Sequence, residues 1–115
     1  MGNKEQINKL KSALIDRYEE NNNNHGGGCV PEVKDAYFRD EDLSVFDLYN
    51  FDLSHVDFYK AKLINTNLTN ANLEYSSFFD ANLSYSTLVN ANFCNTDLRN
   101  TVLITIIYIN FYKFP

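Results

Sequence analysis

One hydrophobic position recurs every five residues between Ala36 and Thr105. Each block of five has Leu or Phe at its third position, in fourteen blocks out of fourteen. From Ala61 onward, the first position of every block is Ala, Ser or Thr. The third-position residues, here called the central residues, are Phe38, Leu43, Leu48, Leu53, Phe58, Leu63, Leu68, Leu73, Phe78, Leu83, Leu88, Phe93, Leu98 and Leu103. This regularity predicts that one short structural unit is repeated along most of the chain.

A period of five fits neither of the common secondary structures. In an α-helix it would spread the apolar side chains around the whole surface, and in a β-strand it would send alternate ones to opposite faces. A solenoid satisfies the pattern, because each block can turn the chain by a constant angle and keep its central residue inside.

The aromatic residues indicate how many blocks make one coil. Phe38, Phe58 and Phe78 recur at every fourth block, and Leu98 continues the row. If four blocks make one coil, Phe stacks on Phe inside, and outside an arginine lies at each end of an aromatic pair. The outward residues that follow the row are Arg39, Tyr59, Phe79 and Arg99, and after them come Asp40, Lys60, Asp80 and Asn100.

The array resembles the pentapeptide-repeat family, whose pattern is A-(D/N)-L-x-x. The closest copies are Ala71-Asn72-Leu73, Ala81-Asn82-Leu83 and Ala91-Asn92-Phe93. The resemblance covers residues 36–105 and implies an all-β solenoid, a right-handed quadrilateral β-helix of about 3.5 coils. At the usual inter-strand spacing of ~4.8 Å, the rod would be roughly 17 Å tall.

Residues 1–20 precede this array and predict one amphipathic α-helix over residues 4–20. Its apolar residues recur at spacings of three and four, and Asn3 can act as its N-cap. A helix with one apolar stripe is marginal alone, so we expect it to cap the open first coil; a docking helix for a partner or a second copy is the alternative. The stripe is Ile7, Leu10, Leu14 and Tyr18, and the large residues that would meet it at the otherwise small position are Glu41, Phe46, Phe51 and Val56.

Two polar stretches resemble functional sites, but their sequences favour structural roles. Residues 21–35 are expected to form a linker, because the Asn run and Gly26–Gly28 bury little surface. Four acids lie five residues apart, but on a four-sided coil they point from different sides, so we predict turn-backbone bonding and no metal site. These acids are Asp42, Asp47, Asp52 and Asp57.

The segment 106–115 leaves the five-residue pattern and is mostly β-branched or aromatic. Such a segment is an aggregation hazard if exposed, so it should be covered. It either caps the C-terminal end of the core or forms a homodimer there, as relatives of the resembled family often do. The residues concerned are Ile106, Ile107, Tyr108, Ile109 and Phe111.

Charge and cysteine content narrow the functional classes. The net charge is −5, and the first coil holds five acids against Arg39 alone. Without a basic stripe we expect no direct nucleic-acid binding. Cys29 and Cys94 match no metal motif, so we expect reduced thiols, with a Cys29–Cys94 disulfide as the alternative. No signal peptide opens the sequence and no apolar run is long enough to span a bilayer, so we expect a cytoplasmic protein.

We find no catalytic constellation and no cofactor motif: His25 and His55 are isolated, and Gly26–Gly28 lacks a nucleophile motif. The resemblance implies a non-enzymatic scaffold whose rigid surface binds a protein partner. The candidate surface is Arg39, Asp40, Tyr59, Lys60, Phe79, Asp80 and Arg99. Other outward aromatics, Tyr49, Tyr75 and Tyr85, would mark either an interface or simple stacking along the coil.

The alternative function is DNA mimicry. The sequence resembles the quinolone-resistance pentapeptide proteins, which shield DNA gyrase by imitating duplex DNA. Three features depart from that group: the rod is short, the acids gather in the first coil, and no loop interrupts the array. The protein-binding scaffold is therefore the preferred hypothesis.

Overall fold

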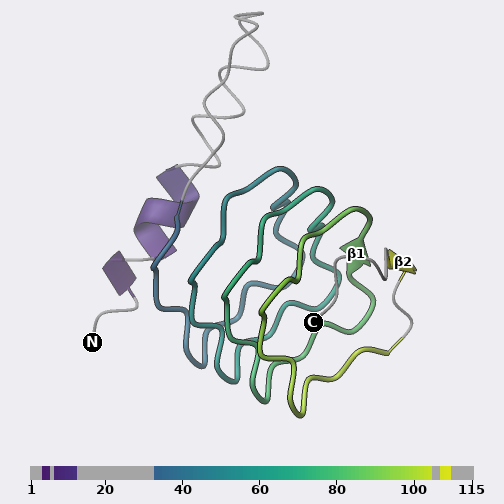
Figure 1. Cartoon of the computed structure of the whole chain (residues 1–115). Helices are drawn as coiled ribbons and strands as arrows, with labels where there is room; N and C mark the ends of the chain where they lie inside the picture. The colour runs from purple at the N-terminus through teal and green to yellow at the C-terminus, as the bar shows by residue number, and fades with distance from the viewer. Residues whose placement is uncertain (1–3, 6, 13–32, 105–106, 110–115) are drawn as a thin grey trace, which may run out of the picture.

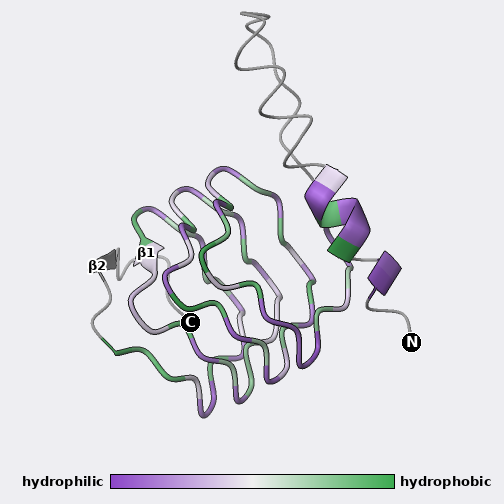
Figure 2. Ribbon diagram, turned by 180° about the vertical axis from the view of Figure 1, so that it is seen from behind, coloured by the Kyte–Doolittle hydropathy of each residue, from purple (hydrophilic) through white to green (hydrophobic). Residues whose placement is uncertain are grey.

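The computed structural model describes residues 4–5, 7–12, 33–104 and 107–109. Residues 33–104 wind into stacked coils that form a short rod, with a helical segment at its N-terminal end and the paired strands β1 and β2 towards its C-terminal end (Figure 1). Seen from behind, hydrophilic and hydrophobic stretches alternate around every coil (Figure 2).

Each coil consists of four blocks. Successive coils are joined by parallel bridges between equivalent residues four blocks apart, from Tyr37↔Asp57 to Asn82↔Val102. The backbone N–H of Phe38 donates to the carbonyl of Asp57 at 2.8 Å, and the N–H of Asp57 donates to the carbonyl of Ala36 at 3.0 Å. The same pair of bonds recurs along the rod, so each coil is held by the next through very short parallel strands.

The corners of the rod are β-turns. The first residue of a block donates its N–H to the carbonyl of the central residue in the block before, as Ala61 does to Phe58 at 2.9 Å. The residue before each corner bond has a positive φ, between 56° and 62°, at fourteen positions from Asp35 to Asn100. Nine of the fourteen are Asn or Asp, the residues that tolerate this left-handed conformation best. The polar part of the repeat therefore makes the turns.

The central residues fill the interior. The rings of Phe38 and Phe58 stack with centroids 5.8 Å apart, and those of Phe58 and Phe78 stack at 4.6 Å. Phe93 belongs to a different column and meets Phe78 at 5.9 Å with the rings tilted by 52°. Leu98, at the end of the Phe column, is half-buried and packs against this core.

The small residues at the first position point inward beside the central residues. Their hydroxyl groups are buried, and a buried hydroxyl needs a hydrogen-bond partner. Thr66 Oγ1 donates to the carbonyl of Leu43 at 3.0 Å, and Thr96 Oγ1 donates to that of Leu73 at 2.8 Å. Threonine at this position thus links one coil to the one before it.

The N-terminal end of the rod is covered. Residues 4–5 and 7–12 are helical and lie beside the first coil (Figures 1 and 2). Leu10 is fully buried within the core cluster, and Ile7 packs against it. Phe51 and Val56, the large residues at the small position, are also buried. The role of this helix as a cap stays a prediction, and Leu14, Tyr18 and residues 21–32, which include Cys29, lie outside the described residues.

The chain continues beyond the array as a strand. β2 (Ile107–Ile109) pairs in parallel with β1 (Thr87–Leu88). The pairing joins Thr87 to Ile107 but Leu88 to Ile109, so the register changes by one residue between them. Ile106 and Phe111, expected in the same cap or dimer segment, lie outside the described residues.

Candidate interaction surface

Four residues from four successive coils form one outward column, here called the ladder: Arg39, Tyr59, Phe79 and Arg99. The rings of Tyr59 and Phe79 are nearly parallel, at 7°, with centroids 5.8 Å apart. The Arg39 guanidinium carbon lies 5.5 Å from the Tyr59 centroid, and that of Arg99 lies 5.2 Å from the Phe79 centroid. Each guanidinium faces the negative side of a ring, which is a favourable cation–π arrangement.

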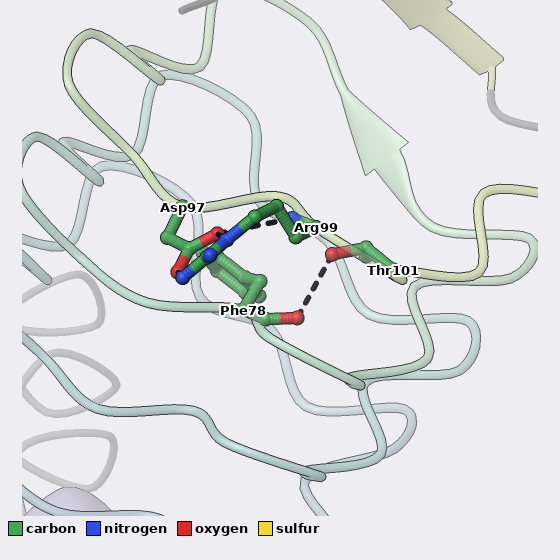
Figure 3. A network of polar contacts seen from close by, with 4 residues as sticks. All are labelled: Phe78, Asp97, Arg99 and Thr101. Atoms are coloured by element: carbon green, nitrogen blue, oxygen red, sulfur yellow. Dashed lines mark hydrogen bonds and ion pairs between the residues drawn. The ribbon is translucent and has the colours of Figure 1, made fainter.

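A carboxylate orients each arginine. Arg39 Nε donates to the Asp57 carboxylate. Arg99 binds Asp97 through two bonds, Nε to Oδ1 at 2.9 Å and Nη2 to Oδ2 at 2.8 Å (Figure 3). Both pairs are exposed at the arginine end, with side-chain exposures of 60% for Arg39 and 77% for Arg99. Their main effect is therefore to orient the guanidinium groups, since exposed ion pairs add little stability.

The same contacts shift the titration of these groups. The hydrogen bonds from the Arg99 side chain and backbone N–H lower the pKa of Asp97 to about 2. The hydrogen bond to Asp57 and its charge raise the pKa of Arg39, and those of Asp97 raise the pKa of Arg99. Both ends of the ladder thus stay charged across the physiological pH range.

The ladder is tied to the core next to it. Phe79 follows Phe78, whose carbonyl accepts a hydrogen bond from Thr101 Oγ1 at 2.8 Å, beside the Asp97–Arg99 pair (Figure 3). Phe78 also stacks on Phe58 inside the rod. The outer rings therefore stand on a backbone that an inner row of rings holds in place.

Exposed charges of alternating sign flank the ladder. Asp40, Lys60 and Asp80 occupy the positive-φ turn positions immediately after Arg39, Tyr59 and Phe79. The ammonium nitrogen of Lys60 lies 5.2 Å from the Tyr59 ring centroid. The candidate residues therefore form one continuous strip of aromatic and charged groups on a single face.

A comparison with models of protein families identifies the repeat. The model of pentapeptide repeats matches in 8 copies, over residues 36–74 and 76–104, which is more than half of the chain. The chain belongs to the pentapeptide-repeat family. A comparison with curated proteins found no match.

Solved structures of pentapeptide-repeat proteins are similar to the chain. One from the thylakoid lumen of Arabidopsis thaliana has a TM-score of 0.54 and 21% identity, over 65% of this chain and 55% of that one. Rfr23 from the cyanobacterium Cyanothece 51142 has a TM-score of 0.38 and 26% identity, over 70% and 62%. HetL from Nostoc sp., involved in heterocyst differentiation regulation, has 0.34 and 24%, over 67% and 35%.

The likeness to the Arabidopsis structure concerns the fold alone. It implies that the four-block coil is the right-handed, four-sided β-helix of pentapeptide-repeat proteins. The chain spans less than two thirds of the length of each of these three structures.

The other outward aromatics of the pentapeptide rod lie apart from the ladder. Tyr75 and Tyr85 are about half exposed, at 54% and 51%, and occupy different columns. Tyr75 stacks on His55, with ring centroids 5.0 Å apart. Only Tyr59 and Phe79 of the five predicted outward aromatics, all of them in the described part of the chain, are therefore brought together as a stacked pair on the candidate surface.

Sequence reasoning missed the two carboxylates that hold the arginines. Asp57 and Asp97 share a column with Tyr37 and Ser77, because bridges connect residues four blocks apart. Comparing the second position of each block at intervals of four blocks would have placed both acids beside the ladder. The five-residue spacing shows Asp57 only as one of four acids in a row.

Asp and Asn residues at the second position of several blocks bond the turn backbone. Asp42 accepts the N–H of Ser44 at 3.0 Å, and the hydrogen bonds from Ser44 lower the pKa of Asp42. Asp52 accepts the N–H of Ser54 at 3.1 Å, and Asp57 accepts that of Tyr59 at 3.0 Å. These bonds favour the tight turn that each block needs.

Two searches of the structure concern metals and membranes. In residues 4–5, 7–12, 33–104 and 107–109, no three or more His, Cys, Asp or Glu side chains gather in a way that could hold a metal ion. None of the helical residues described forms a helix of the length and apolarity that crossing a membrane requires.

Proposed function

We propose that the protein is a non-enzymatic scaffold that binds a protein partner through the ladder and its flanking charges. The observation that carries the proposal is the stacked Tyr59–Phe79 pair, held between two arginines on a rigid face. Aromatic and arginine side chains dominate the binding energy of many protein interfaces. Here they are ordered without a partner, which reduces the entropy lost on binding.

The charge pattern indicates the kind of partner. Along the flanking column the sign alternates from Asp40 to Lys60 to Asp80. A surface of this kind has no large field of one sign, so it suits a partner with an equally mixed polar rim around an apolar centre. Neither a nucleic acid nor a strongly basic protein is favoured by it.

Affinity capture from the cells that make the protein tests this proposal. The test variant is Tyr59→Ser/Phe79→Ser, and the matched control is Tyr75→Ser/Tyr85→Ser, which also removes two aromatic rings but from other faces. We expect a partner that is captured by the wild type and the control but reduced at least about tenfold with the test variant. Circular dichroism confirms that both variants remain folded.

Arg39→Glu/Arg99→Glu provides a second variant. Both side chains are largely exposed, so reversing their charge leaves the core intact. Loss of the same partner would assign the binding to the ladder. Equal capture by the wild type and both ladder variants would refute the proposed surface.

The DNA-mimicking alternative is less well supported by the charge arrangement. A mimic needs rows of acids spaced along the rod like phosphates. In this rod Asp42 lies next to Lys62 in the following coil, and Asp57 pairs with Arg39. A supercoiling assay with DNA gyrase distinguishes the two, because a mimic inhibits or protects the enzyme and the proposed scaffold leaves its activity unchanged.

A further inference from the structure

The ladder and the column beside it are nearly symmetric from one end of the rod to the other. The ladder has an arginine at each end and two rings in the middle, in the order Arg39, Tyr59, Phe79 and Arg99. The flanking column consists of exposed turn residues with a positive φ, namely Asp40, Lys60, Asp80 and Asn100. Turning this face end over end therefore exchanges arginine with arginine, ring with ring, and Lys60 with Asp80.

This symmetry suits a contact between two copies of the chain. A two-fold homodimer joins the same surface of both copies, so that residue i of one copy meets residue j of the other and j meets i. In an antiparallel, face-to-face pair with its axis midway between Tyr59 and Phe79, Lys60 of each copy lies opposite Asp80 of the other. Asp40 of each copy then meets the uncharged amide of Asn100, so no like charges meet along the flanking column.

Lys60 and Asp80 are available for these two pairs. Both side chains are exposed, and within the described part of the chain neither forms an ion pair with a side chain of its own copy. The Lys60 ammonium nitrogen lies 5.2 Å from the Tyr59 ring centroid, so its charge is already held beside the ladder. Opposite charges placed in this way around an apolar centre fix the register of an interface.

The ladder supplies that apolar centre. The facing sides of the Tyr59 and Phe79 rings cover each other, and a guanidinium covers each outer side. A protein partner therefore contacts the edges of the rings, and in the antiparallel pair the Tyr59 edge of one copy meets the Phe79 edge of the other. Aromatic groups at the centre with charged groups around them are the usual arrangement of a protein interface.

The two arginines do not meet as bare charges. Arg39 of one copy approaches Arg99 of the other, but Arg39 is paired with Asp57 and Arg99 is paired with Asp97 (Figure 3). The contact therefore brings together two ion pairs, in which each guanidinium has a carboxylate of its own.

We propose that the ladder and the flanking column form an antiparallel, two-fold homodimer interface in which Lys60 of each copy pairs with Asp80 of the other. This inference rests on the proposed function, since it names a second copy of the chain as the protein that the ladder binds. From Arg39 to Arg99 the ladder rises by about 14 Å, at ~4.8 Å for each coil. A contact of this height is at the small end of protein interfaces, so we expect half-association on the order of 100 µM.

A parallel pairing of the same face is less favourable. With the two-fold axis along the ladder, Lys60 would face Asp57 of the second copy, and Asp80 would face Ser77. Asp57 already accepts a hydrogen bond from Arg39, and its side chain is only 18% exposed, so it is poorly placed to bind a second cation. The antiparallel orientation instead joins two exposed charges of opposite sign.

Charge exchange tests the interface, with sedimentation velocity of the full chain from about 10 µM to about 1 mM as the measurement. Lys60→Asp and Asp80→Lys each place like charges opposite one another twice, so each should weaken association at least about tenfold. The double variant Lys60→Asp/Asp80→Lys restores opposite charges and should associate within about threefold of the wild type. Each introduced residue type already occupies this turn position in an adjacent coil, so the variants should fold as the wild type does.

Mixing the two single variants gives the sharpest result. In a mixed pair the introduced aspartate faces the introduced lysine, and the native Asp80 faces the native Lys60. The equimolar mixture should therefore associate as the wild type does, although each variant alone does not. Repulsion within one chain cannot be relieved by mixing, so a mixture that associates no better than its components would overturn the proposal. An Asp80→Lys variant that associates like the wild type, as the parallel pairing requires, would overturn it too.

Lys62→Asp is the matched control, because it makes the same change of charge at an exposed residue on the neighbouring side of the rod. It should leave association within about twofold of the wild type. A wild type that stays monomeric at about 1 mM, or a dimer that neither single exchange weakens, would overturn the homodimer. Capture of another protein that depends on Tyr59 and Phe79 would then still support the scaffold function, whose own failure is seen separately as equal capture by the wild type and both ladder variants.

Discussion

The two ends of the rod differ in how their cores are closed. In the first coil the four central residues, Phe38, Leu43, Leu48 and Leu53, are all fully buried. In the last four blocks burial holds for Leu88 and Phe93 but fails at Leu98 and Leu103.

The cause of this difference in burial lies in the sequence outside the five-residue repeat. Each internal coil is covered on both sides by neighbours with the same pattern, whereas a terminal coil lacks one neighbour and needs a cap. At the N-terminal end, Leu10 from the helical segment is buried in the core cluster together with Phe51 of the first coil. At the other end the small Thr101 keeps the internal pattern, so the repeat itself supplies no extra bulk. The five-residue repeat specifies the stacked coils of the rod, but the covering of its two ends depends on sequence outside the repeat.

The largest effect is expected from placing a charge in the core, midway along the stacked coils. Leu73→Asp should abolish folding, because Leu73 is fully buried and the charge would have no partner. Leu103→Asp at the open end should remain folded, since Leu103 is already 37% exposed. Far-ultraviolet circular dichroism of the two variants checks this, and a folded Leu73→Asp would show that the repeat does not form the core.

The next largest effect is expected at the predicted N-terminal cap. Leu10→Ala should lower the free energy of unfolding by about 2–5 kcal/mol, the usual range for a buried leucine. Lys9→Ala is the matched control, because Lys9 lies in the same helical segment and is exposed. Urea denaturation compares the two, and equal stabilities would mean that the helix contributes nothing to closing the first coil.

A smaller and opposite effect is expected at a turn of the first coil. Val45 has a φ of 62° and its side chain is 72% exposed, so a β-branched residue occupies a conformation it disfavours. Val45→Asn should raise the free energy of unfolding by about 1 kcal/mol. Asn65→Val, in the same column one coil later, should lower it by a similar amount. Urea denaturation of both variants tests whether the two changes in free energy of unfolding are equal and opposite. An unchanged stability of Val45→Asn would contradict backbone strain at Val45.

The smallest effect concerns pH at the last coil. The pKa of Asp97 is about 2, below its ordinary value of 3.8, so its contribution to stability is complete above pH 4 and disappears as the pH falls towards 2. Arg99→Gln removes the guanidinium whose hydrogen bonds are the largest single cause of the lowered pKa. Thermal unfolding between pH 2 and 6 should show the wild type losing its small advantage over this variant within that window; a constant difference would contradict the pairing.

Much of the stacked coils could be predicted, because the strict five-residue period repeats the same pattern of buried and turn positions many times. The four-block spacing of Phe38, Phe58 and Phe78 places their rings in one inner column, and the same spacing places Tyr59 beside Phe79 outside. The extra residue before Ile109 could not be predicted in this way. A single extra residue leaves no periodic signal of its own in the sequence.

The candidate site was predicted only in part for a related reason. Columns of side chains follow from the period, but ion pairs between neighbouring columns depend on rotamers. Arg39 reaches across the face to Asp57 in the next coil, whereas Arg99 pairs with Asp97 in its own block. The two arginines have equivalent places in the repeat, so the repeat could not distinguish these arrangements.

The outward-pointing turn residues have a consequence for how such a protein can change over time. Because the positive-φ position is satisfied by residues as different as Asp40, Lys60 and Tyr85, the backbone tolerates wide variation there. Each of the four sides can therefore acquire new chemistry without disturbing the other three or the interior. Rungs on one side repeat at about 4.8 Å, the spacing between strands in any β-sheet. The rod therefore presents outward residues at a fixed spacing on four sides, and each side can be substituted independently.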